Sequence, residues 1–297
     1  MHNQSVSRDR FFEAAAKFTP LVAVDSLEAR FIVSTGDEAV GRRLFRGRRR
    51  GEMVTLARTV EILEALGQVH WVRGTTFLDL GANIGTSAIT ALRSHDFARA
   101  VACEPEPENY RLLKVNAAMN DVDDLLTGLQ VAVSDHCGTA TLALDPINSG
   151  GHFVITGDRE QETLTVEAVS VDYLIERGVL DSQAVGLIWI DAQGYEGQII
   201  KGASSLTERG IPIVLEFHPL MLQRTGGRAM LEEIIPARYT HFIDLRGVEA
   251  GDPPTFELRP AEELSALAEN LVGQESHFTD LLAVRLDPGA NHAHRGT

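Results

Sequence analysis

The chain has 297 residues, 44% of them hydrophobic, which is enough for one large α/β domain with additions or for two small domains. Its formal net charge of −15 argues against binding to a nucleic-acid backbone as the main function. No apolar run approaches the ~20 residues needed to span a bilayer, and the N-terminus lacks a signal-peptide core. Cys103 and Cys137 have no metal-ligand spacing and are expected to be reduced, so a cytoplasmic protein is expected.

The N-terminal part of the chain, residues 1–74, is predicted to be an extension or cap. Residues 11–17 are typical of a helix, and residues 29–33 of a short strand. Residues 53–66 carry apolar side chains near helical spacing and are followed by Gly67. This pattern predicts an amphipathic helix with a C-terminal glycine.

Strand and helix patterns alternate over residues 75–286, which are predicted to form the main domain. Alternation is typical of an α/β fold with a doubly wound, Rossmann-like parallel sheet, whose sites lie at the carboxyl ends of the strands. Seven strands are expected, at residues 76–80, 99–104, 129–134, 187–191, 211–217, 240–245 and 280–285.

An insertion interrupts this alternation. Residues 139–171 contain short alternating runs rich in β-branched side chains, which predict an inserted antiparallel β segment. Its strands are expected at residues 139–144, 153–156 and 164–171. The polar residues 287–297 are expected to form a flexible tail.

A glycine turn follows the first predicted strand of the main domain. The strand contains Asp79 and leads into Gly81, Asn83 and Gly85 before a predicted helix. Such a turn brings backbone N–H groups and a helix N-terminus close to a ligand. Asp79 is expected to support a cofactor directly or through the turn, with capping of the turn as the alternative. Asn83 equally suits a tight turn.

The second strand ends in Glu104, about twenty-five residues after the turn begins, which is the distance at which a βαβ unit places an acid on a ribose diol. Its two oxygens suit paired hydroxyls. The alternative is an acid that faces solvent beside Glu106 and Glu108. A nucleoside-containing cofactor is therefore expected.

The spacing of the turn favours one class of cofactor. In the dinucleotide fingerprint G-x-G-x-x-G, glycines stand where this chain has Asn83 and Thr86. The pattern D-x-G-x-x-x-G instead resembles motif I of methyltransferases that use S-adenosylmethionine (SAM).

Further motifs extend this resemblance to the FkbM-type methyltransferases. They follow the order of that family at residues 79–85, 104–109, 113–116, 133–135, 190–196, 201–203 and 216–218. The resemblance covers about residues 41–218, with weaker similarity at residues 281–284. It implies a SAM-dependent O-methyltransferase acting on hydroxyls of sugars, lipids or polyketide-type products. One departure is Gln193, where the family more often has Glu, and this puts an acid role at that position in doubt.

The resemblance also implies that Ser134 or Asp135 lies near the adenine amine, although a Ser-Asp turn before Gly138 is an equally ordinary explanation. Two later strand ends carry candidate catalytic residues. Asp191 ends the fourth predicted strand and is a candidate general base or metal ligand. Glu216 and His218 end the fifth and share one face, and a histidine there suits removal of a hydroxyl proton.

Three further features leave alternatives open. A divalent metal on Asp191, Glu216 and His218 is conceivable but not indicated, because no three acids are closely spaced. The loop 148–152 contains His152, an alternative base, and is equally consistent with a plain hairpin connection. The six arginines of residues 42–50 suit an anionic acceptor or lipid headgroup, with a solvated surface as the alternative.

The sequence thus predicts a SAM-dependent O-methyltransferase whose partner is a small-molecule, sugar or lipid acceptor, with no nucleic acid and no membrane span. An NAD-dependent oxidoreductase and a catalytically silent SAM-binding protein are the alternatives. Asn83 and Thr86 disfavour the first, and Gln193 keeps the second open.

Overall fold

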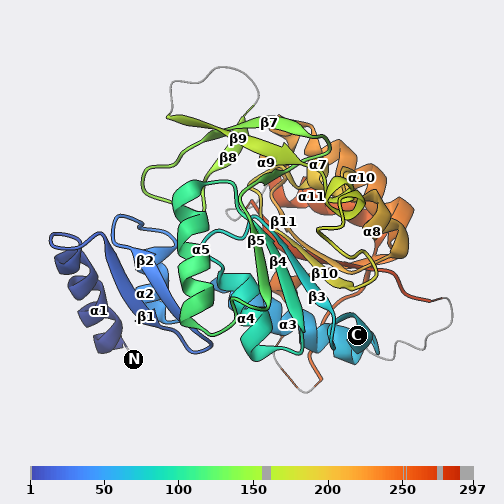
Figure 1. Cartoon of the computed structure of the whole chain (residues 1–297). Coiled ribbons are helices and arrows are strands. Elements are labelled where there is room, and N and C mark those ends of the chain that lie inside the picture. The colour runs from blue at the N-terminus through green and yellow to red at the C-terminus, as the bar shows by residue number, and fades with distance from the viewer. Residues whose placement is uncertain (1, 156–161, 250, 252, 273–276, 288–297) are drawn as a thin grey trace.

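The computed structural model describes residues 2–155, 162–249, 251, 253–272 and 277–287 (Figure 1). Its centre is an eight-stranded mixed sheet in the order β13-β12-β14-β11-β10-β3-β4-β5. The strands are β3 (Thr76–Leu80), β4 (Arg99–Cys103), β5 (Leu126–Leu129), β10 (Val185–Ile190), β11 (Ile213–Phe217), β12 (His241–Asp244), β13 (Arg259–Pro260) and β14 (Thr279–Val284).

Five neighbouring strands of this sheet are parallel to one another, in the spatial order β11, β10, β3, β4 and β5. The strand β14 lies between β11 and β12 and runs antiparallel to both. The predicted doubly wound, Rossmann-like α/β fold is confirmed, but the sheet is mixed rather than parallel throughout, because β14 and β13 pair antiparallel with their neighbours. An eighth strand, the two-residue β13, extends the sheet beyond the seven expected.

The prediction of a third central strand at residues 129–134 is wrong. The central sheet uses β5 (Leu126–Leu129), and the chain then turns so that β6 (Ala132–Val133) pairs with a different sheet. Both Ala132 and Val133 are buried in that second location. The apolar run therefore continues across the turn, and hydrophobicity alone does not reveal the break.

The inserted segment forms a second sheet in the order β6-β9-β7-β8. Its strands β7 (Gly138–Ala143), β8 (Phe153–Ile155) and β9 (Thr163–Val169) pair antiparallel, as predicted, and only β6 and β9 are parallel. The predicted end of the middle strand, Thr156, lies outside the described residues, as do residues 288–297 of the predicted tail.

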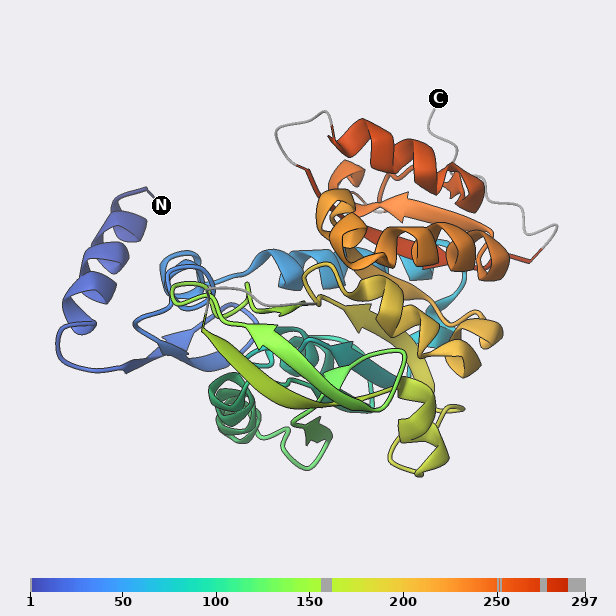
Figure 2. The same ribbon diagram turned by 90° about the horizontal axis from the view of Figure 1, so that it is seen from above.

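Helices cover both faces of the central sheet (Figures 1 and 2). They are α1 (His2–Ala15), α2 (Gly41–Gly47), α3 (Gly51–Ala65), α4 (Thr86–Ser94), α5 (Pro107–Met119), α6 (Val171–Glu176), α7 (Glu196–Lys201), α8 (Ser204–Arg209), α9 (Pro219–Thr225), α10 (Gly227–Arg238) and α11 (Leu264–Val272). Short 3-10 helices are η1 (Val69–Trp71), η2 (Leu245–Gly247) and η3 (Ala261–Glu263).

Two hydrophobic cores follow from the alternation of side chains along each strand. Phe77 of β3 packs into one core with buried residues of α3, α4 and α5. Its neighbours Leu78 and Leu80 pack into the other core, with residues of α7, α8, α10 and α11. The central sheet is therefore buried on both faces, and this explains why its strands read as continuous apolar runs.

Local signals fix where several helices begin and end. The Glu106 carboxylate accepts a hydrogen bond from the N–H of Asn109 (2.7 Å) at the start of α5, where Pro107 is the first residue. Ser170 caps α6 in the same way. Gly210 ends α8 in a left-handed conformation with φ of 71°.

The N-terminal extension contains a hairpin as well as the expected helices. Strands β1 (Leu21–Asp25) and β2 (Arg30–Ser34) pair antiparallel, and α1 lies at the far end of the molecule from the orange and red C-terminal helices (Figure 2). The predicted helix at residues 53–66 corresponds to α3. The proposed boundaries after residues 74 and 286 stay predictions.

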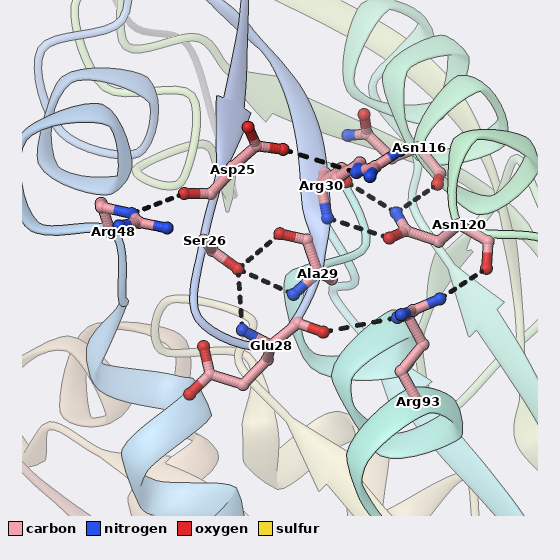
Figure 3. Close-up of polar contacts among 9 residues, drawn as sticks. All are labelled: Asp25, Ser26, Glu28, Ala29, Arg30, Arg48, Arg93, Asn116 and Asn120. Carbon is pink, nitrogen blue, oxygen red and sulfur yellow. Dashed lines mark hydrogen bonds and ion pairs between the residues drawn. The ribbon is translucent and has the colours of Figure 1, made fainter.

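Two asparagines of the α5 region bind the open edge of this hairpin (Figure 3). Asn116 accepts from the N–H of Ile32 (2.6 Å), and Asn120 both accepts from the N–H of Arg30 (2.9 Å) and donates to its carbonyl (2.6 Å). Arg93 of α4 adds bonds to the carbonyls of Glu28 and Asn120. The extension is therefore anchored to the main sheet's helices by directional contacts. Among the described residues, no helix is both long and apolar enough to cross a bilayer.

Candidate functional site

A cavity of about 760 Å³ lies where β3, β4, β10 and β11 end. Residues of α2, α3, the inserted segment and the start of β14 complete its wall. Six of the predicted site residues line it: Gly81, Asn83, Glu104, Asp191, Glu216 and His218. Four others do not line it: Asp79, Gly85, Ser134 and Asp135.

The loop after β3 needs its glycines because it passes very close to another strand end. Gly81 has φ of 97°, and a Cβ there would clash with the carbonyl oxygen of Asp191. Gly85 has φ of 88° at the N-cap of α4. Asn83 also adopts positive φ, at 50°. The loop therefore presents backbone rather than side chains to this end of the cavity.

The Glu104 carboxylate is held by backbone N–H groups from two directions. One oxygen accepts from Asn83 (2.8 Å) and the other from Glu106 (2.9 Å), and the residue is only 5% exposed. Burial raises the pKa of Glu104 to about 7, against the opposing effect of these hydrogen bonds. The Asn109 side chain also hydrogen-bonds this carboxylate, and its remaining acceptor capacity can receive hydroxyls from the cavity.

Asp79 lies beneath the loop rather than at the cavity surface. Its carboxylate accepts from the N–H of Ala88 in α4 (3.0 Å), and burial raises its pKa well above the ordinary value. This contact matches the alternative interpretation, capping of the turn. Asp79 can thus support a cofactor only through the position of the loop and helix.

Ser134 and Asp135 point into a polar group beside the cavity. The Ser134 hydroxyl is buried and lies 3.3 Å from the Tyr195 hydroxyl. Partial burial opposes ionisation of Asp135, but hydrogen bonds from His136 and Lys201 (both 2.9 Å) lower its pKa to about 2. The cavity wall at this point is instead formed by apolar residues just upstream: Val131, Ala132 and Val133.

Gln193 joins the two acids predicted at the strand ends. Its side-chain amide donates to Asp191 Oδ1 (2.9 Å) and to Glu216 Oε2 (3.0 Å). Burial raises the pKa of both acids, and the charges of Asp191, Glu196 and Asp280 raise that of Glu216 further. The residue that departs from the family pattern therefore separates and orients two carboxylates at the cavity wall.

Two acids of this wall were missed from the sequence. Asp280 lies opposite Glu216 in the β11–β14 register, and burial raises its pKa to about 6. Glu52 of α3 pairs with Arg50 (2.6 Å) and accepts from the Thr86 hydroxyl (2.8 Å). Asp280 reaches the cavity because β14 runs antiparallel to β11, so the start of β14 lies beside the end of β11. The sequence pattern did not reveal the direction of β14.

His218 has a structural contact as well as a place in the cavity wall. Its Nδ1 accepts from the N–H of Met221 (3.4 Å) at the start of α9, and its ring stacks on Phe278 with centroids 6.2 Å apart. Burial lowers its pKa. With Nδ1 accepting, the neutral ring carries its proton on Nε2, so it is arranged to donate rather than to accept a proton.

The loop of residues 145–152 is attached to the glycine turn. Asn83 and Asn109 both donate to the carbonyl of Ser149, at 2.8 and 3.1 Å. His152 Nδ1 accepts from the N–H of Asp145 (3.0 Å), as in an ordinary loop closure. The described residues contain no group of three or more His, Cys, Asp or Glu arranged to hold a metal ion.

Comparison with known proteins identifies the family. The model described as the methyltransferase FkbM domain matches residues 79–246, more than half of the chain. The chain belongs to the FkbM methyltransferase family. Membership implies SAM as the methyl donor and confirms the resemblance seen in the motifs.

Individual relatives are more distant from this FkbM-family chain. The methyltransferase sdnD of Sordaria araneosa is 28% identical over 152 residues, which cover 42% of this chain and 59% of that protein. The chain thus spans less than two thirds of that relative.

Two solved structures are also similar. The methyltransferase FkbM from Methylobacillus flagellatus KT has a TM-score of 0.40 and 14% identity, covering 82% of this chain and 60% of that one. The O-methyltransferase from Bacillus cereus in complex with S-adenosylhomocysteine (SAH) has a TM-score of 0.44 and 12% identity, covering 80% and 83%.

Proposed function

We propose that this chain is a SAM-dependent O-methyltransferase acting on a hydroxyl of a small molecule, sugar or lipid. The observation that carries the proposal is the arrangement of one cavity. Glu104 and the glycine turn lie at one part of its wall, and the paired acids Asp191 and Glu216 lie at another. Family membership supports methyl transfer, and the acids support an acceptor that loses a proton.

The residues at the cofactor end fit SAM. Glu104 keeps acceptor positions for the ribose hydroxyls, and Gly81 leaves backbone in the place where a side chain would stand. The apolar wall formed by Val131 and Val133 suits a flat adenine ring. When bound there, SAM supplies an electrophilic methyl group on its sulfonium sulfur.

Asp191 is our candidate for the base that takes the acceptor proton. Burial raises its pKa above that of an exposed aspartate, which makes the carboxylate a stronger base, and Gln193 fixes its orientation. His218 is better placed to donate a hydrogen bond from Nε2 to the acceptor. Alignment of the acceptor oxygen and exclusion of water by the bound cofactor and acceptor are expected to contribute most of the acceleration.

The first test is a thermal melt of the purified chain with SAH and, separately, with NAD. A ligand that binds only the folded state raises the midpoint. We expect SAH alone to raise it. A rise with NAD alone would support the oxidoreductase alternative and contradict the proposal.

The second test is a screen of sugar, lipid and polyketide hydroxyls for methyl transfer from SAM. With an accepted hydroxyl, Asp191→Asn is expected to lower kcat by roughly 10²–10⁴-fold, as for loss of a general base. SAH affinity should stay within about twofold, because the carboxylate acts on the acceptor. Full turnover in the variant would exclude Asp191 as the base. SAH binding without transfer to any hydroxyl would favour the catalytically silent alternative.

A further inference from the structure

The arginine-rich segment 42–50 divides into two groups in the structure. Four of its six arginines bind other parts of the protein. Arg42 pairs with three acids, which are Asp9, Glu13 and Glu38. Arg48 donates to the Asp25 carbonyl, and Arg49 and Arg50 form ion pairs with Glu28 and Glu52, respectively. These contacts hold the extension together. They account for most of the basic run without any ligand.

The remaining two, Arg43 and Arg46, both line the cavity. They are three residues apart on α2, which places them on one side of that helix. Both are exposed, and neither side chain has a hydrogen bond or ion pair with any residue that the structure describes. Arg46 acts on the protein through its charge, which adds to the hydrogen bond from Arg42 in lowering the pKa of Asp9.

The position of α2 at the cavity is fixed by packing. Leu44 and Phe45 are buried on its inner side. Gly41 lies so close to the Ser34 carbonyl of β2 that a Cβ would meet it, and β2 is bound in turn by Asn116 and by Asn120, whose bonds with Arg30 are shown in Figure 3. The two free guanidinium groups are therefore held at the cavity wall by a braced helix rather than by a loose surface segment.

Arg49 and Arg50 also line the cavity, but they are paired with Glu28 and Glu52, and the remaining charges lie on different elements. Asp191, Glu216 and Asp280 line the region at the ends of β10, β11 and β14, where they repel one another and any other anion. Arg43 and Arg46 lie on a different element, α2, and attract anions. An acceptor with one anionic group would enter with that group at α2 and with its uncharged hydroxyl toward Asp191.

We propose that Arg43 and Arg46 bind a phosphate group carried by the methyl acceptor, and that this contact orients the acceptor hydroxyl toward the acids. The inference rests on the proposed function, because it assumes that this cavity takes the acceptor. Two guanidinium groups offer several N–H donors to phosphate oxygens. The phosphate belongs either to a soluble phosphate monoester or to a lipid headgroup.

The test compares the wild-type chain with the double variant Arg43→Gln/Arg46→Gln, both saturated with SAH. The control is Arg99→Gln/Arg177→Gln, which removes the same charge from two exposed arginines outside the cavity. One arm titrates sn-glycerol 3-phosphate, with glycerol as its uncharged counterpart. The other arm measures cosedimentation with phosphatidylglycerol/phosphatidylcholine vesicles, with pure phosphatidylcholine as the reference.

We expect the wild type and the control to bind at least one phosphate probe and neither reference. The Arg43/Arg46 variant should bind that probe at least ~tenfold more weakly. Binding in the first arm indicates a soluble phosphate, and binding only in the second indicates a headgroup. Equal binding by the Arg43/Arg46 variant, or no binding of either probe by the wild type, would overturn the inference.

SAH titration of the same samples separates this inference from the proposed function. Arg43→Gln/Arg46→Gln is expected to keep SAH affinity within about twofold, which also shows that the variant is folded. Failure of the wild type to bind SAH would instead overturn the proposed function. The two failures are therefore distinguishable.

Discussion

The two ends of the cavity are built in different ways. The cofactor end comes from three short segments, the turn after β3, the end of β4 and residues 131–133, and the turn presents mainly backbone. The acceptor end combines side chains from α2, α3, β10, β11 and β14, which span most of the chain. A site made of backbone requires glycines at a fixed spacing, which can be recognised in the sequence. A site made of side chains that are far apart in the chain has no such local sequence pattern.

The largest effect is expected at the turn after β3, where the cofactor end lies against the backbone of Asp191. Gly81→Ala adds a Cβ against the Asp191 carbonyl and must also adopt φ of 97°. Gly178→Ala is the matched control, because φ there is 70° but no atom lies within 4 Å. We expect Gly81→Ala to lower the free energy of unfolding by about 1–3 kcal/mol more than Gly178→Ala, as overpacking does. Urea unfolding of both variants measures the difference.

If both substitutions lowered the free energy of unfolding equally, the close approach of the loop after β3 to the end of β10 would not require a glycine. Such a result would also remove the main physical reason for a glycine at position 81. SAH titration of the variants that fold would then show whether the turn still belongs to the cofactor end.

At the acceptor end, Gln193→Glu tests the bridge between Asp191 and Glu216. The change removes both N–H donors and places a third carboxylate beside two others, so the pKa of Asp191 should rise. If ionised Asp191 is the base, the acid limb of the kcat–pH profile moves to higher pH by about one unit or more.

The control for this shift is Gln193→Met, which removes the donors without adding charge and should move the limb less. A profile that is identical in Gln193→Glu and wild type would mean that Asp191 and Glu216 do not control turnover. SAH affinity, measured at the same pH values, should change little in either variant.

The smallest effect is expected for Asp135, which lies outside the cavity. Its pKa is lowered from 3.8 to about 2, so its hydrogen bonds with His136 and Lys201 stabilise the fold above pH 3.8 and this contribution is lost as the pH falls toward 2. Asp135→Asn should lower stability at pH 7 by at most ~1 kcal/mol, as for exposed ion pairs. SAH affinity should be unchanged. A large loss of SAH affinity would contradict this and would indicate that Asp135 contributes to cofactor binding.

Much of the fold was readable from the sequence because most central strands are buried on both faces and stand out as apolar runs. Gly81 and Glu104 were also predicted together and both line the cavity, since a βαβ unit fixes their spacing, whereas Asp79 lies beneath the loop. The break after β5 was missed because apolar residues continue through the turn into β6. Hydrophobicity predicts that a residue is buried, but it does not predict in which sheet the residue lies.

The acceptor end was only partly predictable. Asp191 and Glu216 were found because both lie at ends of parallel strands, but Asp280 opens an antiparallel strand whose direction the pattern does not give. The roles of Gln193 and His218 depend on single hydrogen bonds made after folding. Such contacts follow from tertiary geometry rather than from local sequence.

The pH dependence of SAH binding offers a finer test of the cofactor end. Ribose hydroxyls donate to the ionised form of Glu104, whose pKa in the free protein is raised to about 7. SAH affinity should therefore fall as the pH drops below 7. In Glu104→Gln, the affinity should be weaker and nearly independent of pH over the same range.

The most direct measurement is calorimetric titration of SAH into the wild type, Glu104→Ala and Glu108→Ala. Glu108 is a nearby exposed acid on α5 that pairs with Arg111, so it controls for loss of charge. The account predicts binding by the wild type and Glu108→Ala, and a loss of at least ~tenfold in affinity for Glu104→Ala. Equal SAH affinity in Glu104→Ala and wild type, or no binding by the folded wild type, would contradict it.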